Sequence, residues 1–363
     1  MSNNQRRPPS AEMEVVMEFA RTKQNDSRSR PLQKKLAKDR RAVIAVDGRV
    51  SMMTYRNYVL KRWLPLTEMG VEPVTAESYR RQMNNYILPA LGHVRVGSLD
   101  RATIQGFYAD LLRNNSPFRG RPLGKGTVIR IHCMVHASFE DLVQTGQLSS
   151  NPARGLRPRH TKSERYEYTI WSEAELASFL DQAKNHPLFP LWRVMAFTGL
   201  RRGEALGLKR SDVRLDQRQL CVRRAVGIVD RDLYITRPKT DAERVIELDG
   251  ETAKVLKRHL RKIDPRPEAW VFGDGVGDLI EPSRVSVAFK DLIATMDLPR
   301  IRLHDLRHTH ASHLILAGVN VKAVQERLGH SDVVVTLNIY SHVLPTTQRD
   351  AVKQLERFYG SAR

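Results

Sequence analysis

The stretch from His304 to Tyr340 carries side chains whose types and spacing could act on a phosphodiester. His304 and Arg307 stand three positions apart in the phrase HDLR, a spacing that places helical residues on neighbouring surface. His330 follows in the phrase LGHS, and Tyr340 lies ten residues beyond it. Guanidinium groups bind phosphate oxygens in pairs, imidazoles move protons near neutral pH, and a phenolate can attack phosphorus. The stretch therefore predicts phosphoryl transfer with a tyrosine nucleophile.

Two earlier phrases add further candidates. FTGLRRGEALGLKRSDV, at 197–213, holds Arg201 at a turn that Gly199 should create by ending a helix. Glu204 follows three residues later and is expected to orient a catalytic arginine or histidine. Lys239 lies in RPKTDAERVIEL, at the mouth of the last of several predicted β-hairpins. Each residue type alone is more often a surface or core residue, so only their combination predicts a site.

Hydrophobic periodicity predicts the elements that must position these residues. Ser172 and Glu175 have the spacing of a capping box that opens a helix. Residues 212–248 alternate as short strands do, with turns at 215–218, 229–232 and 240–243. Further helices are predicted over 189–197, over 251–263 and over 284–295, the last with Ser283 as its cap. Another helix should contain the phrase HDLR and end at a turn over 318–320. The helix after it is predicted over 321–328 and should end at Gly329.

Four amphipathic patterns between residues 51 and 156 predict a compact helical bundle. The bundle offers basic side chains as candidate contacts to a DNA backbone: Arg80, Arg81, Lys125 and Arg130. For any single one of these residues, a solvated position on the surface is the commoner role. The first three helices are expected to begin after a capping residue, which is Thr54, Thr75 and Asp100 in turn. The first helix should end before Pro65. The fourth helix is expected over 126–145 and should end at Gly146.

Composition divides the chain into segments. Nine basic residues within 21–41 indicate a basic segment at the start of the chain. A stretch rich in proline and charged residues indicates a linker after the helical bundle. An amphipathic helix is predicted over 348–358. The expected segments are an extension at 1–50, a helical domain at 51–156, a linker at 157–167, a catalytic domain at 168–343 and a tail at 344–363.

The charge balance predicts a polyanionic partner. The 363 residues include 60 Lys and Arg against 40 Asp and Glu, a formal net charge of +20. An excess of this size favours nucleic acid, with a generally basic protein as the plain alternative. No membrane span or signal peptide is predicted, and Cys133 and Cys221 are expected to be buried, reduced thiols. These features predict a reducing cytoplasm.

Histidines near HDLR raise the alternative of a zinc site. His308, His310 and His313 follow His304 closely, but no cysteine or acidic ligand completes a set, so no metal is expected. His308 and His310 are expected to support packing. GDGVGD, at 273–278, is expected to be a plain turn because it lacks the strand–loop–helix context of a phosphate loop. The sequence predicts no cofactor.

The phrases as a set resemble a known family. LHDLRHTHAS at 303–312, LGHS at 328–331 and the tyrosine beyond resemble the C-terminal signature of the tyrosine recombinase (phage integrase) family. FTGLRRGEALGLKRSDV resembles that family's other arginine box, and the order is the family's. ILPALG at 87–92 and NPA at 151–153 are similar to phrases of its core-binding domain. The resemblance covers the last half of the chain strongly and the middle third loosely.

The resemblance implies a multidomain, mainly α protein. A helical core-binding (SAM-like) domain would precede a mixed α+β catalytic domain with a small antiparallel sheet. Attack by Tyr340 would leave a 3′-phosphotyrosine and a free 5′-hydroxyl, with Lys239 as general acid and no cofactor. Glu204 would orient a catalytic arginine or histidine without contacting the reacting atoms. The implied catalytic residues are Arg201, Lys239, His304, Arg307, His330 and Tyr340.

The implied partners are double-stranded DNA attachment sites, with a homotetramer exchanging strands through a Holliday junction. The resemblance also implies host factors that bend DNA or direct excision, an arm-binding role for the extension at 1–50, and a tail that docks on a neighbouring protomer. The sequence departs from relatives at Lys209 and Arg210, where an aromatic residue is common, and some relatives have nine residues rather than ten before the tyrosine.

The leading interpretation is an integrase of a phage or mobile element. Its basic extension favours integration over the more compact chromosome-resolving type. Two alternatives stay open: a non-catalytic DNA-binding regulator on the same scaffold, and a topoisomerase IB-like nicking-closing enzyme.

Overall fold

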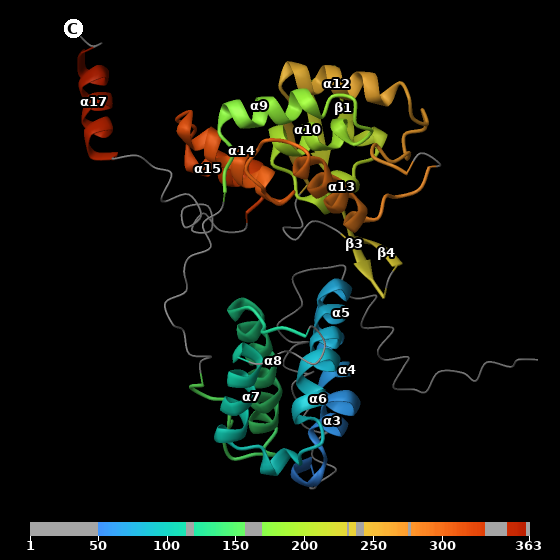
Figure 1. Ribbon diagram of the computed structural model, residues 1–363, viewed down its shortest axis with the longest axis vertical. Helices are drawn as coiled ribbons and strands as arrows, with labels where there is room; N and C mark the ends of the chain where they lie inside the picture. The colour runs from blue at the N-terminus through green and yellow to red at the C-terminus, as the bar shows by residue number, and fades with distance from the viewer. Residues whose placement is uncertain are drawn as a thin grey trace, which may run out of the picture. The chain divides into compact units, whose positions relative to one another are not determined.

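The computed structural model describes residues 50–113, 120–156, 169–230, 232–236, 243–274, 277–330 and 347–360. The chain forms two compact units, Met1–Lys162 and Ser163–Arg363 (Figure 1). Most of the predicted extension, residues 1–49, and the predicted linker lie outside the described residues. The same holds for Lys239 and Tyr340.

The first unit is helical within its described residues, and several of its helices continue into one another. Short π-helical stretches, η2 and η3, join α-helices end to end, and α7 packs against α8 (Figure 1). The elements are η1 (Val50–Met52), α3 (Tyr55–Tyr58), η2 (Val59–Trp63), α4 (Leu64–Glu68), α5 (Pro73–Gln82), η3 (Met83–Ile87), α6 (Leu88–Leu91), η4 (Val96–Ser98), α7 (Arg101–Arg113) and α8 (Lys125–Gln144).

Three predicted helix ends of this unit are confirmed. The hydroxyl of Thr54 caps α3 by accepting from the backbone N–H of Asn57 at 3.3 Å. Asp100 accepts from the backbone N–H of Thr103 at 2.8 Å, just before α7. Gly146 has a φ of 74°, which suits a glycine after a helix end.

Two other predicted ends are wrong, and both errors come from proline. The helical run does not stop before Pro65, because it passes through the π-helical stretch η2 into α4, and Pro65 lies in the first turn of α4. Thr75 does not cap the next helix. That helix, α5, begins at Pro73 after Glu72, because the fixed φ of proline suits a first helical position.

Buried tyrosines fasten α3 to α8. The hydroxyl of Tyr55 lies 2.6 Å from Oγ of Ser138, and the hydroxyl of Tyr58 donates to the Ser138 carbonyl at 2.8 Å. The ring of Tyr55 stacks on Phe139, with the ring centroids 5.3 Å apart. Burial raises the pKa of Tyr55, so its hydroxyl keeps its proton. These pairings satisfy the polar groups of an otherwise apolar core.

The second unit mixes helices with short strands. The predicted capping box is confirmed, since Ser172 and Glu175 bond reciprocally at the start of α9. The predicted cap Ser283 is wrong because α13 begins earlier, at Pro282. The elements are α9 (Glu173–Gln182), α10 (Phe189–Thr198), α11 (Arg202–Leu206), η5 (Arg210–Asp212), β1 (Val213–Arg214), β2 (Gln219–Val222), β3 (Ala225–Val229), β4 (Asp232–Thr236), β5 (Arg244–Glu247), α12 (Gly250–Leu260), α13 (Pro282–Ala294), α14 (Asp305–Leu316), α15 (Val321–Leu328) and α17 (Thr347–Gly360).

The strands form two small antiparallel sheets rather than a row of hairpins. One sheet has the order β1-β2-β5, and the other pairs β3 with β4. The predicted last hairpin is therefore wrong: β5 pairs with β2, with Cys221 opposite Val245, and not with β4. Alternation in a sequence gives the faces of a strand but not its partner.

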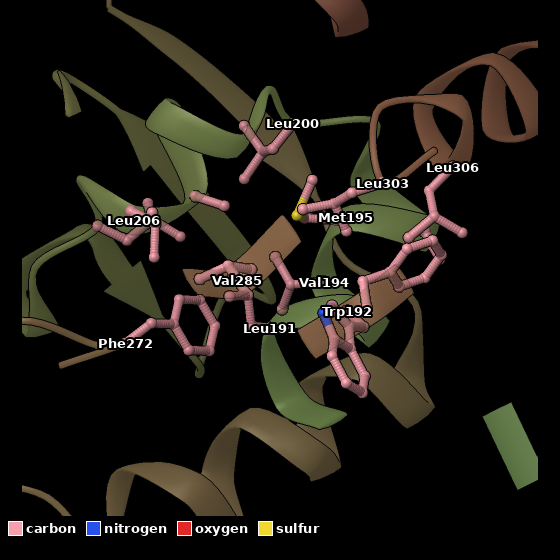
Figure 2. Packing of buried hydrophobic residues seen from close by; sticks show 14 of the residues in the cluster. Leu191, Trp192, Val194, Met195, Leu200, Leu206, Phe272, Val285, Leu303 and Leu306 are labelled. Atoms are coloured by element: carbon pink, nitrogen blue, oxygen red, sulfur yellow. The ribbon is translucent and has the colours of Figure 1, made fainter. Parts of the chain in front are cut away.

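The core of the second unit surrounds α10. Figure 2 shows Trp192, Val194 and Met195 of this helix among side chains from α13, α14 and the segment that precedes α14. The ring of Trp192 lies 5.9 Å from Phe179 and 5.8 Å from Phe289, measured between centroids. Because the arginine-bearing turn follows α10 directly, this packing fixes where the turn begins.

Three general predictions can be compared with the described residues. Cys221 is buried and reduced, as predicted, whereas Cys133 is reduced but exposed, because it lies on the outer side of α8. No helix in the described ranges is long and apolar enough to cross a membrane. Within the same ranges, no cluster of three or more His, Cys, Asp or Glu side chains is arranged to hold a metal ion.

Candidate active site

The turn between α10 and α11 presents Arg201. Gly199 ends α10 in the left-handed region, with a φ of 66°, as the sequence predicts. Arg201 then takes an extended conformation as the residue before α11. Its side chain therefore leaves the backbone at the turn and is 37% exposed.

Glu204 lies behind Arg201 and is almost completely buried, with 3% of its side chain exposed. Its carboxylate accepts from the backbone N–H and from Nη1 of Arg201, both at 2.8 Å. On its other side it accepts from Nη1 and Nη2 of Arg244 at 3.1 and 2.7 Å. Burial alone would raise the pKa of Glu204, but the hydrogen bonds and charges of Arg244 and Arg201 lower it to about 2. The carboxylate is thus ionised at neutral pH, between two guanidinium groups.

Arg307 is buried, and it fastens the ends of two helices. Its Nη1 donates to the carbonyl of Gly199 at 2.6 Å, and its Nη2 donates to the carbonyl of Leu328 at 2.8 Å. Arg201 donates from Nη2 to the next carbonyl, that of Gly329, at 3.1 Å. The two arginines therefore meet at adjacent carbonyls at the end of α15, where the helix dipole favours positive charge.

Two histidines lie within the electrostatic reach of these arginines. His304 directly precedes α14, and the partial burial of its ring, together with the charge of Arg307, lowers its pKa. His330 follows Gly329, and its backbone N–H and carbonyl both pair with Gln325, at 3.1 and 2.8 Å. Burial, followed by the charges of Arg307 and Arg201, lowers the pKa of His330 to about 4. Both imidazoles are thus neutral near pH 7.

The structure brings together four of the six predicted catalytic residues: Arg201, His304, Arg307 and His330. Their combined field attracts an anion. A phosphate held there would offset the arginine charges and raise the pKa of the neutral imidazoles. The arrangement can therefore stabilise charge on a phosphodiester and accept a proton.

Profiles of two families match the chain. The profile described as the phage integrase family matches residues 172–347, and that of the N-terminal SAM-like domain of phage integrases matches residues 57–112. Together they cover more than half of the sequence. The chain belongs to the tyrosine recombinase (phage integrase) family. It is therefore a DNA strand-transferring enzyme.

Individual relatives agree with this assignment. The XerC-like tyrosine recombinase of Caldanaerobacter subterraneus subsp. tengcongensis is 27% identical over 329 residues, which cover 83% of this chain and 82% of the relative. The Tn1549 transposon integrase in complex with a circular intermediate DNA has a TM-score of 0.72 at 20% identity, covering 84% of this chain and 99% of that one. A lambda integrase tetramer bound to a Holliday junction has a TM-score of 0.61 at 15% identity, covering 88% and 87%. The predicted fold of this recombinase is confirmed.

Arg244 is the residue of the recombinase site that the sequence analysis missed. It begins β5, far along the chain from Glu204, which it contacts with two hydrogen bonds. A weak signal was present, since Arg244 lies two positions before the apolar Ile246, and residues two apart in a strand share one face. The sequence alone, however, does not say which acid such an arginine meets.

The four predicted DNA contacts of the recombinase stay predictions. Arg80 pairs with Glu68 at 3.0 Å and with Glu77 at 3.4 Å, so its charge is partly compensated by its own unit. Nε of Arg130 donates to the carbonyl of Gly126 at 3.3 Å. The other two candidates, Arg81 and Lys125, are exposed.

Lys209 and Arg210 make local contacts within the second unit. The Lys209 ammonium lies 4.9 Å from the ring centroid of Trp270. Nη1 of Arg210 donates to the carbonyl of Leu260 at 2.7 Å. Neither contact reaches the arginines of the site.

Replacing Gly199 by alanine should destabilise the recombinase by about 2–4 kcal/mol. A Cβ there would meet Cδ2 of Leu328 at 2.6 Å and Cδ2 of His310 at 2.8 Å, in addition to the strain of a positive φ. Urea denaturation measures the change. Gly318→Ala is the matched control, because Gly318 also has a positive φ but a Cβ would meet nothing within 4 Å. Equal losses for both variants would contradict the steric argument.

Acid should destabilise the recombinase through its buried histidines. Burial lowers the pKa of His308 to about 4 and that of His310 to about 3, whereas an unfolded histidine titrates near 6.5. Between these values unfolding takes up protons, so stability is complete above pH 6.5 and falls as pH drops toward 4. We expect a loss of about 2 kcal/mol or more between pH 7 and pH 5 in urea denaturation. His308→Gln should flatten this dependence, and unchanged stability at pH 5 would refute it.

Proposed function

We propose that this recombinase is a site-specific integrase that inserts a phage or another mobile element into DNA, or excises it. The observation that carries the proposal is the meeting of Arg201 and Arg307 at the end of α15, with His330 next in the chain. Two fixed guanidinium groups can hold one phosphate by several hydrogen bonds. The likeness of the fold to that of the Tn1549 transposon integrase supports a role in element movement.

Cleavage would begin with the phenolic oxygen of Tyr340. In the proposal, that oxygen forms a bond to the scissile phosphorus while the bond from phosphorus to the 5′ oxygen breaks. The 3′ end of the DNA is then esterified to the tyrosine. Lys239 gives a proton to the departing 5′ oxygen, and a 5′-hydroxyl is released.

The described residues would supply the remaining functions. Arg201 and Arg307 would hold the non-bridging oxygens, whose negative charge grows in the transition state. Tyr340 must lose its proton, and a neutral imidazole at His304 or His330 can take it. The lowered pKa of His330, about 4, keeps that ring neutral until phosphate binds.

Rejoining would reverse these steps on a new partner. A 5′-hydroxyl from another strand attacks the phosphotyrosine, and the phenol leaves with a returned proton. The covalent ester conserves the free energy of the broken bond, so no nucleotide hydrolysis is needed in this scheme. Bond making and bond breaking balance at each step.

Assembly would follow the arrangement of the relatives. The lambda integrase structure holds a tetramer on a Holliday junction, and we propose a homotetramer on paired attachment sites for this chain. The helical unit would contact the DNA backbone through basic residues such as Arg81 and Lys125, which are exposed. Host factors that bend DNA would act in addition.

A nicked suicide duplex tests the proposal. The duplex spans the DNA that flanks the gene, and a nick close to the cut lets a short fragment diffuse away, so that rejoining is prevented. We expect a protein–DNA adduct that survives denaturation. Recovery of no adduct from any flanking duplex would overturn the proposal.

A two-site assay separates integration from simple nicking and closing. Two duplexes with different end labels are incubated with the protein, and products that carry both labels are measured. An integrase gives such products. A nicking-closing enzyme gives an adduct but no exchanged product, and that result would overturn the integrase assignment.

A further inference from the structure

Arg244 and Arg201 both donate hydrogen bonds to one carboxylate, that of Glu204. Both terminal nitrogens of the Arg244 guanidinium donate to Glu204, at 3.1 and 2.7 Å. The Arg244 side chain is only 12% exposed. Pairing at two points fixes both the place and the plane of the carboxylate. Glu204 in turn bonds to Arg201 at its backbone and at its side chain.

The three charges form a chain with one unit of positive charge in excess. Glu204 carries one negative charge between Arg201 and Arg244. When both arginines are present, the carboxylate is compensated by Arg244, and the charge of Arg201 can act on a ligand. Without Arg244, Glu204 and Arg201 would form a neutral pair, which attracts phosphate less.

Arg244 also lies against the end of α15. Gly329 ends that helix with a φ of 65°, and a Cβ there would meet Nη1 of Arg244 at 2.7 Å. The carbonyl of Gly329 accepts from Arg201, and His330 is the next residue. One guanidinium therefore touches the carboxylate behind Arg201 and the backbone that carries His330.

The placement of Arg244 carries a cost that packing alone does not require. Its Nε is buried and has no acceptor among the described residues. An unpaired buried N–H costs about 1–3 kcal/mol. A hydrophobic side chain at this start of β5 would avoid that cost, so packing alone does not account for an arginine here.

We propose that Arg244 is a positioning residue for strand cleavage. It compensates Glu204 so that Arg201 keeps its charge for the scissile phosphate, and it supports the turn from which His330 approaches the same phosphate. The inference rests on the proposed function, since it concerns cleavage at that site. Arg244 acts through Arg201 and His330 and does not touch the reacting atoms.

Single-turnover cleavage of the nicked duplex tests the inference in the full chain. Arg244→Gln should lower the cleavage rate by about 10–100-fold, since small misplacements of phosphate-binding groups have effects of this size. The affinity for the same duplex should change by less than about threefold, because many phosphate contacts determine it. Arg244→Lys should recover part of the rate, because lysine restores the charge but not the two-point pairing.

The pH profile gives a readout that a purely structural role would not change. Arg244 is the main partner that lowers the pKa of Glu204, so in Arg244→Gln that pKa should rise. The acid limb of the rate profile should then shift to higher pH. In the background of Glu204→Gln, the Arg244→Gln change should have a smaller effect, because the two residues act as one unit.

Arg224→Gln is the matched control. Arg224 pairs with Asp212, a fully buried acid of the same unit, and it donates to the Gly207 carbonyl at 3.2 Å. Its loss should lower stability without lowering the cleavage rate of the folded protein.

The outcomes separate the two proposals. If the unchanged protein forms the adduct and Arg244→Gln cleaves at the same rate and with the same pH profile, the inference about Arg244 is wrong. Equal slowing by Arg224→Gln would also overturn it, since the effect would then be one of stability. If the unchanged protein forms no adduct with any flanking duplex, the proposed function fails and the inference fails with it.

Discussion

Tyr340→Phe should abolish the covalent adduct while DNA binding is retained. Phenylalanine keeps the ring but lacks the oxygen that would be esterified to the 3′ end. Removal of a nucleophile lowers rates by about 10⁴-fold or more, so no adduct should accumulate on the nicked duplex over hours. The dissociation constant, measured by fluorescence anisotropy, should stay within about threefold, because phosphate contacts over the whole duplex dominate affinity.

Tyr234→Phe is the control for this experiment. Tyr234 lies on β4 in the same unit and is 37% exposed, so its ring is available to solvent but lies outside the proposed chemistry. It should form the adduct at the normal rate. An adduct with Tyr340→Phe would mean that another residue attacks the phosphate, and the assignment of Tyr340 would be wrong.

Arg307→Lys should lower the rate of adduct formation by about 10²–10³-fold, the usual effect of losing one preorganised donor. Lysine keeps a positive charge but cannot bond two acceptors in one plane. It should also destabilise the fold by about 1–3 kcal/mol, because one of the carbonyls of Gly199 and Leu328 loses its donor. Single-turnover cleavage measures the first effect, and urea denaturation measures the second.

Arg327→Lys separates the two effects of the Arg307 change. Arg327 also donates to two backbone carbonyls, those of Phe197 and Glu247, both at 3.0 Å. The control should therefore lose comparable stability but cleave normally when folded. If Arg307→Lys cleaves as fast as Arg327→Lys, Arg307 does not bind the scissile phosphate.

The sequence predicted well the features of the site that depend on neighbours in the chain. Gly199 was expected to end a helix and release Arg201 at a turn, and its positive φ does so. Gly329 was expected to end the helix before His330, and it does so in the same way. A glycine after an apolar periodic stretch has one strongly preferred local structure, so such predictions need no tertiary information.

The features that the sequence did not predict depend on contacts between distant segments. The partner of β5 is β2 because the core under both strands selects that pairing, and alternation could not indicate it. Arg244 was missed for the same reason, since its acid lies on a helix 40 positions earlier. The phrase HDLR likewise could not predict that Arg307 is buried against the ends of two helices. It predicts only that the arginine lies on the same helix face as His304.

The bonds of Arg307 to the protein's own backbone have an evolutionary consequence. A descendant that no longer cut DNA would still need this guanidinium to hold Gly199 and Leu328 together. It would have no comparable reason to keep the phenol of Tyr340. In genomes that carry decayed copies of mobile elements, the arginine should therefore outlast activity, and loss of the tyrosine should be the earlier sign of an inactive gene.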